Sequence, residues 1–163
     1  MNPTVRPVRA CRRRQRGVVT LEFALMLILG LVPLLMLTYT GVMIMAVQQT
    51  LSMASAEGAR ASLRYASNSD RRAAACLAAR RSMQWLLNYA GQTPDCSNAG
   101  APPIVVSAPA PCAGLASAQC MQVSVSYDYG SKPFLPGTGR LYGWVVSEPI
   151  RSTAVAQLDL GTP

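Results

Sequence analysis

The distribution of apolar residues along the chain predicts one long N-terminal helix. Residues 18–47 form a run of 30 residues with a single charged side chain, Glu22. At about 1.5 Å of rise per residue, such a helix measures roughly 45 Å, and a bilayer core needs only about 20 residues. The run is also longer than the apolar part of a secretory signal peptide, and its end has no convincing A-x-A cleavage site. We therefore predict a transmembrane helix over residues 18–47.

The helical pattern continues beyond the apolar run and predicts a helix extension over residues 48–66. Apolar or small residues recur there at alternating steps of three and four, which is typical of a heptad-like seam: Ile44, Val47, Leu51, Ala54, Gly58, Ala61 and Tyr65. Ala54, Gly58 and Ala61 are small enough to let another backbone approach closely. We favour packing of this seam on the chain's own domain. Packing on other subunits is the alternative, and both can hold at different ends of the seam.

A second helix is predicted after a polar break at residues 68–70, whose side chains suit an N-cap. This helix runs from about Asp70 to Ala90, and Gly91 is a suitable residue to end it. We expect its arginines to lie on a solvated face: Arg71, Arg72, Arg80 and Arg81. Trp85 and Tyr89 are expected in the core or at its rim.

The rest of the chain predicts a short antiparallel sheet. Residues 92–120 are rich in Pro, Ala, Ser, Gly and Cys and indicate a loop tied down by disulfides, with a β-prone island at residues 104–106. Residues 121–129 alternate between apolar and polar side chains, as a half-buried strand does. Residues 141–146 form a strand or a packed loop. Residues 151–160 form a weaker final strand, with these candidate buried contacts: Val155, Leu158 and Leu160. The expected fold class is α+β, with two or three antiparallel strands in a head at residues 67–163.

The positive charge is concentrated beside the apolar run. Residues 1–17 hold six arginines and no acidic residue, whereas the remaining chain contributes only +2 to the net charge of +8. This asymmetry is typical of a cytoplasmic flank, so we expect the N-terminus in the cytoplasm and the head on the outer side. The leader contains no aromatic residue that could stack on bases, and we expect no nucleic-acid partner.

The cysteines predict disulfides in the head. Cys11 lies in the leader, and four cysteines follow the apolar run: Cys76, Cys96, Cys112 and Cys120. They indicate two disulfides with three open connectivities, and four free thiols are the alternative. The chain has no histidine and no CxxC pair, so we expect no metal site. No nucleotide-binding or protease motif occurs, and we expect neither a cofactor nor an enzymatic activity; an anchored hydrolase with paired carboxylates is the weakest alternative.

Glu22 has two interpretations. It lies within about two turns of the predicted helix start, where it can reach interfacial water and the positive end of the helix. Alternatively, cleavage of the leader after Gly17 frees an α-amino group at Val18. In a pack of parallel helices, each Glu22 could then neutralise the Val18 amine of a neighbour and set the axial register.

Two segments carry a resemblance to a known family. Residues 16–27, RGVVTLEFALML, resemble a prepilin processing site and the opening of the TadE-like minor pilins of tight-adherence (Flp-type) systems. Residues 55–61, SAEGARA, are similar to the alanine-rich E-G-A-R segment of that family. The chain departs from the family in Val18-Val19, where alanines are commoner, and in Phe23, where major pilins have tyrosine after the glutamate.

The resemblance implies cleavage between Gly17 and Val18 by a membrane aspartyl prepilin peptidase, with Glu22 as the fifth residue of the mature chain. It implies a pilin-like fold and a non-enzymatic role as a minor pilin or pseudopilin in Flp pilus biogenesis, adhesion and biofilm formation. The implied partners are the inner membrane, the peptidase, other pilins and the assembly-platform proteins of the system. The alternative is an uncleaved, single-pass anchor whose outer head is a binding domain.

Overall fold

The computed structural model describes residues 15–64, 67–97, 101–145 and 148–158. The chain divides into two compact units, Met1–Tyr39 and Thr40–Pro163, and each is considered by itself. The leader before residue 15 lies outside the described residues, as do Tyr65 of the predicted seam and Leu160 of the predicted last strand.

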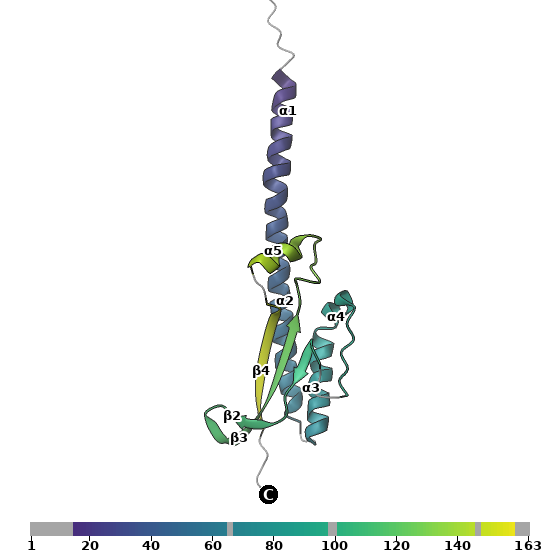
Figure 1. Cartoon of the computed structure of the whole chain (residues 1–163), viewed down its shortest axis with the longest axis vertical. Helices are drawn as coiled ribbons and strands as arrows, with labels where there is room; N and C mark the ends of the chain where they lie inside the picture. Colours follow the sequence, from purple (N-terminus) through teal and green to yellow (C-terminus); the bar gives the residue numbers. More distant parts are fainter. Residues whose placement is uncertain (1–14, 65–66, 98–100, 146–147, 159–163) are drawn as a thin grey trace, which may run out of the picture. The chain divides into compact units, whose positions relative to one another are not determined.

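The N-terminal unit is helical throughout its described part (Figure 1). It contains α1 (Gln15–Met26), a short π-helix η1 (Leu27–Leu31) and the beginning of α2 (Val32–Ser62). The helical stretch Gly17–Ser62, 46 residues long, is long and apolar enough to cross a membrane, and none of its most apolar part is buried. The predicted long apolar N-terminal helix is therefore confirmed.

The π-helix ends two residues before Pro33. The N–H of Val32 donates to the carbonyl of Leu27, five residues earlier. Proline has no N–H, and in a regular α-helix its ring crowds the carbonyl four residues before it, here that of Leu29. Proline and π turns are both recognised sites of helix distortion. The irregularity of the helix near Pro33 thus takes the form of one wider turn on its N-terminal side.

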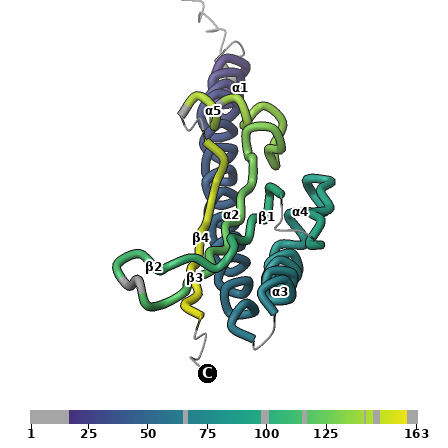
Figure 2. The backbone as a smooth tube through the Cα atoms, turned by 60° about the horizontal axis from the view of Figure 1, so that its bottom comes forward, coloured from purple at the N-terminus to yellow at the C-terminus, as the bar shows by residue number. Residues whose placement is uncertain are grey.

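The second unit holds the C-terminal part of α2, three further helices and a sheet (Figures 1 and 2). The remaining elements follow in chain order: α3 (Asn68–Ser82), α4 (Gln84–Ala90), β1 (Ile104–Val106), β2 (Ala110–Cys112), β3 (Leu115–Tyr127), α5 (Thr138–Val145) and β4 (Ile150–Leu158). All strand pairs are antiparallel. The head is therefore α+β, as predicted, but the sheet that the described residues form has four strands rather than two or three.

The long strand β3 organises the sheet. It pairs with β4 over nine residues, from Gln119 opposite Leu158 to Tyr127 opposite Ile150. Its other edge pairs with the two three-residue strands β1 and β2. The prediction left both short strands inside a loop, because segments of three residues gain strand structure only from pairing with a longer neighbour.

One face of β3 forms the centre of the core, as its alternating sequence predicts. The side chains of Met121, Val123, Val125 and Tyr127 are buried. Tyr129, predicted on the same face, lies beyond the end of the strand and is also fully buried. The strand begins at Leu115, six residues before the predicted start.

α2 packs against this face through small residues. Val47, Leu51 and Ala54 are fully buried, and β3 and β4 run beside this part of α2 (Figures 1 and 2). A Cβ atom placed on Gly58 would lie 2.9 Å from Cγ1 of Val123 and 3.1 Å from the carbonyl oxygen of Ala75. Gly58 therefore lies where helix α2 meets both the sheet and α3.

The predicted single helix over residues 70–90 is two helices in the structure. It is interrupted at Met83, whose φ of −109° and ψ of 19° leave the α-helical region and whose side chain is fully buried. The first helix starts earlier than predicted, because the Ser67 hydroxyl accepts a hydrogen bond from the Asp70 N–H and caps it. Gly91 ends the second helix with a positive φ of 67°, as its residue type predicts.

Arg71 does not belong to a solvated face, contrary to the prediction. It is only 5% exposed, because it shares one side of α3 with the fully buried Ala75 and Ala79, four and eight residues later. Arg80 and Arg81 are exposed, as expected.

Two predictions for the last third of the chain are wrong. Residues 141–146 were expected to form a strand or packed loop, but α5 spans most of them; short apolar runs do not distinguish helix from strand. Val155 was a candidate core residue but is exposed, because it lies opposite the exposed Gln122 on the outer face of the sheet. Leu158 is buried, as predicted.

Replacement of Gly58 by alanine should destabilise the head. The new methyl group would overlap a stiff β-branched side chain and a backbone carbonyl, so we expect a loss of about 1–3 kcal/mol in the free energy of unfolding. Denaturant unfolding of the detergent-solubilised chain measures this loss.

Gly41→Ala is the matched control, because Gly41 lies on the same helix with no atom within 4 Å of its Cβ position. It should leave the free energy of unfolding unchanged or raise it by up to about 1 kcal/mol. Equal stability of the two variants would contradict the close packing at Gly58.

Candidate functional site

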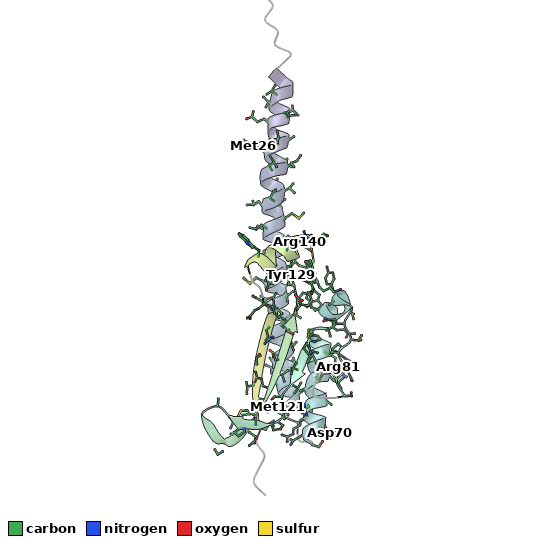
Figure 3. The ribbon with its side chains drawn as sticks, in the orientation of Figure 1. Met26, Asp70, Arg81, Met121, Tyr129 and Arg140 are labelled. Carbon is green, nitrogen blue, oxygen red and sulfur yellow. A yellow bond between two sulfur atoms is a disulfide. The ribbon has the colours of Figure 1, made fainter. Side chains whose placement is uncertain are left out.

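The candidate site is an apolar helical surface that carries one carboxylate. Glu22 lies on one side of α1 among apolar neighbours, and that side continues into the π-helix: Val18, Leu21, Leu25, Met26, Leu29 and Gly30. The apolar side chains of this surface are exposed, and Figure 3 shows Met26 projecting freely from the helix. Glu22 forms no ion pair with any described residue. A carboxylate in hydrocarbon is costly unless it reaches water or a cation, so this surface suits a partner that supplies one.

The predicted cleavage position lies near the start of α1. Gly17 is the third residue of this helix, and apart from the adjacent residues and backbone of its own helix, no atom of the described residues lies within 4 Å of its Cβ position. Val18 is exposed. A peptidase that binds an extended segment would have to unwind only the first turn of the helix, and terminal turns open at low free-energy cost. Cleavage between Gly17 and Val18 stays a prediction.

The small-residue seam is largely occupied by the chain's own head. Ala54 and Gly58 are buried against it, whereas Ala61 is half-buried. On the same stretch of helix, the hydroxyl groups of Ser55 and Ser152 lie 3.1 Å apart and join α2 to β4. The part of the seam around Ala54 and Gly58 is therefore not available to another subunit.

The ion pair of the E-G-A-R segment is a local surface contact. Nη1 of Arg60 donates to Oε1 of Glu57 at 2.6 Å, one turn apart on α2, with both side chains well exposed. An exposed pair of this kind contributes well under about 1 kcal/mol to stability.

The four cysteines of the head form two disulfides. Cys76 of α3 pairs with Cys96, and Cys112 of β2 pairs with Cys120 of β3. Of the three connectivities that the sequence left open, the structure has the one in which each cysteine pairs with the next cysteine along the chain. The first bridge ties the irregular chain after α4 to α3. The second closes a hairpin that extends away from the helices (Figure 2).

An aromatic cluster surrounds Phe134. Its ring centroid lies 4.5–6.0 Å from those of four other side chains: Trp85, Tyr89, Tyr127 and Tyr129. Tyr142 extends the cluster, with its ring centroid 5.0 Å from that of Tyr129. Trp85 and Tyr89 lie at the rim, as predicted, but the sequence did not reveal their shared partner. Phe134 stands in a Gly/Pro-rich segment without periodicity, so no sequence signal marks it as a packing centre.

Hydrogen bonds fix this cluster to the chain after β3. The Tyr127 hydroxyl donates to the carbonyl of Lys132 at 2.6 Å, and the Tyr89 hydroxyl donates to that of Pro133 at 2.8 Å. Burial raises the pKa of Tyr127 from 10.0 to about 12. The pKa of the neighbouring Asp128 is lowered, chiefly because its carboxylate accepts a hydrogen bond from the Ser131 hydroxyl.

Within the part of the chain that the structure describes, no group of three potential ligands from His, Cys, Asp and Glu could hold a metal ion. Comparisons with known proteins found no matching family model, no matching curated protein and no matching solved structure. A functional assignment therefore depends on the residues and geometry of this chain.

The buried phenol of Tyr127 predicts a loss of stability at high pH. Below pH 10 the phenol is neutral in both states, whereas between pH 10 and about 12 it ionises only in the unfolded chain. The free energy of unfolding should therefore fall over this range, as denaturant titrations at a series of pH values would measure.

Tyr127→Phe should remove this part of the pH dependence, although it also loses the hydrogen bond to Lys132, worth about 1 kcal/mol. Tyr89→Phe removes a half-exposed phenol that contributes less than burial does to the raised pKa of Tyr127, so it should change the pH dependence less than Tyr127→Phe does. An unchanged alkaline profile for Tyr127→Phe would show that other groups cause the loss.

Proposed function

We propose that the chain is a minor pilin- or pseudopilin-like subunit of a tight-adherence (Flp-type) pilus system. In this role it acts by assembly and not by catalysis. Its N-terminal helix inserts in the inner membrane and packs with the helices of other pilins, while the head stays on the outer side. The coarse arrangement, a long apolar helix joined to a small α+β head, is compatible with a pilin-like fold.

The observation that carries the proposal is the contrast along the helical stretch Gly17–Ser62. Its first part exposes apolar side chains around a single carboxylate, Glu22, whereas residues 47–62 are packed on the head. In a helix that served only as a lipid anchor, this carboxylate would do no more than reach interfacial water near the helix start. An assembly of parallel helices gives that carboxylate a function, because cleavage frees a positively charged amine at Val18. The Val18 amine of one helix can then neutralise Glu22 of its neighbour.

The arginines of the leader and the disulfides of the head both indicate how the chain is oriented in the membrane. Six arginines in residues 1–17 favour a cytoplasmic N-terminus. The disulfides Cys76–Cys96 and Cys112–Cys120 favour an oxidising compartment for the head, since cytosolic thiols are kept reduced. Both features support insertion with the head outside the cytoplasm.

Processing is the first test. In cells with the cognate prepilin peptidase, the mature chain should begin at Val18, which N-terminal sequencing or mass spectrometry of the purified protein detects. Gly17→Leu should abolish cleavage, because a bulky side chain replaces the smallest residue at the scissile bond. Gly30→Ala is the control: Gly30 lies in the same apolar run with open space around its Cβ position, and this variant should be cleaved normally. An intact leader in wild-type chain from piliated cells would favour the uncleaved anchor instead.

Assembly is the second test. Glu22→Gln keeps the shape of the side chain but removes its charge, so it should be cleaved like the wild type and yet reduce surface pili at least about tenfold, the effect of losing roughly 1.4 kcal/mol at each contact. Pilus counts by electron microscopy measure the effect. Leu25→Ala, on the same helix surface, is the uncharged control and should reduce assembly less. Normal piliation with Glu22→Gln would refute the register role.

A further inference from the structure

Helix α5 exposes an indole that the head does not cover. Trp144 is 87% exposed, the largest value among the exposed large apolar side chains of the described residues. The other tryptophan, Trp85, is half as exposed and packs on Phe134. An indole that is left open in this way has a large apolar surface available for a partner.

The geometry of α5 places a cation beside this indole. Tyr142 points toward the core, where its ring packs on that of Tyr129. Trp144 comes two positions later, which is 200° around the helix, and therefore points away from the head. Arg140, four residues before Trp144, lies on the same outward side and is exposed; Figure 3 shows it on α5. Gly143 adds no side chain to this surface.

α5 lies level with the end of the apolar run. Tyr142 and Ile44 of α2 pack against the same buried cluster. Tyr142 also lines a shallow cleft of about 400 Å³ together with Gln48. The apolar run ends at Val47, and polar residues follow it on α2. The exposed indole therefore lies near the point where the surface of α2 changes from apolar to partly polar.

We propose that α5 is an interfacial helix, which docks through Trp144 and Arg140 on the headgroup region of the membrane that the apolar run crosses. Tryptophan concentrates at this depth, because its ring is apolar and its N–H needs a polar partner. An arginine near an anionic leaflet is attracted to the lipid phosphates. The two residues together match an anionic phospholipid surface. Tyr142 of α5 shares a cleft with Gln48, the residue that follows the apolar run, and this position favours lipid over another protein as the occupant.

This inference rests on the membrane insertion of the proposed function, but it needs neither leader cleavage nor pilus assembly. Its consequence is that the head has two attachments to the membrane surface, α2 and α5. Before assembly, the second attachment would restrict rotation and tilt of the head.

The two tryptophans allow a direct test with the full chain. Trp85→Phe leaves Trp144 as the single reporter, and Trp144→Phe leaves Trp85. Each variant is reconstituted into anionic phospholipid vesicles, with and without lipids brominated on their acyl chains near the headgroup. We expect the fluorescence of Trp144 to be quenched at least about twofold more than that of Trp85. Arg140→Gln in the Trp85→Phe background should reduce this quenching in anionic vesicles and have little effect in zwitterionic ones.

Flotation of the vesicles separates the possible failures. A chain that floats while Trp144 is quenched no more than Trp85 overturns the docking of α5 and leaves the membrane anchor intact. A chain that does not float overturns both. Selective burial of Trp144 in lipid-free pili, without quenching in vesicles, would assign the surface to another subunit and also overturn the inference.

Discussion

The close approach of α2 to β3 and α3 at Gly58 is the contact on which the head depends. A Cβ atom at this position would lie 2.9 Å from a side chain of β3 and 3.1 Å from a carbonyl of α3, so only glycine lets the three elements meet. Ala54, one turn earlier, is fully buried and keeps the separation small. At such short distances many pairs of atoms are in van der Waals contact, and together their dispersion energy stabilises the packing. The seam of small residues therefore attaches the head to the C-terminal part of α2.

The disulfides compensate for a head with much irregular chain. The described residues between α4 and β1, 91–97 and 101–103, form no helix or strand, and Cys76–Cys96 ties the first of these two stretches to the buried side of α3. Closing a loop of this size contributes about 3 kcal/mol in the chain-entropy model. The segment after β3 is held differently, by the rings around Phe134 and by the hydroxyl groups of Tyr89 and Tyr127, which donate to its carbonyls. The connection to α5 is thus fixed by packing rather than by a cross-link, and Tyr142 of α5 lines a cleft together with Gln48 of α2.

The predictable elements are those whose signal is local. Three such signals are the apolar run, the alternation over residues 121–127 and the glycine at position 91. They predict the long helix, the central strand and the end of a helix, and the structure contains all three. The break at Met83, the short strands β1 and β2, and the cluster around Phe134 depend on contacts between segments distant in sequence. Nothing in the local sequence encodes them, and the same holds for the choice among three disulfide connectivities. Glu22 and Gly17 were identified as special from residue type alone. In the proposed role their partners belong to other molecules, which the structure of a single chain does not contain.

Glu22 has its largest effect in the competition between lipid and protein for the apolar helix. Each large side chain of this surface gains roughly 1.5–3 kcal/mol when it leaves water, and lipid tails and neighbouring helices provide that gain about equally. Apolar burial alone therefore does not favour assembly over the membrane-inserted monomer. A carboxylate distinguishes the two states, because hydrocarbon offers it no partner and a neighbour's freed amine does. In the proposed role, removal of the leader does more than shorten the chain: it creates the cation that makes protein a better environment than lipid for this helix. Processing and assembly are then coupled by a single charge pair.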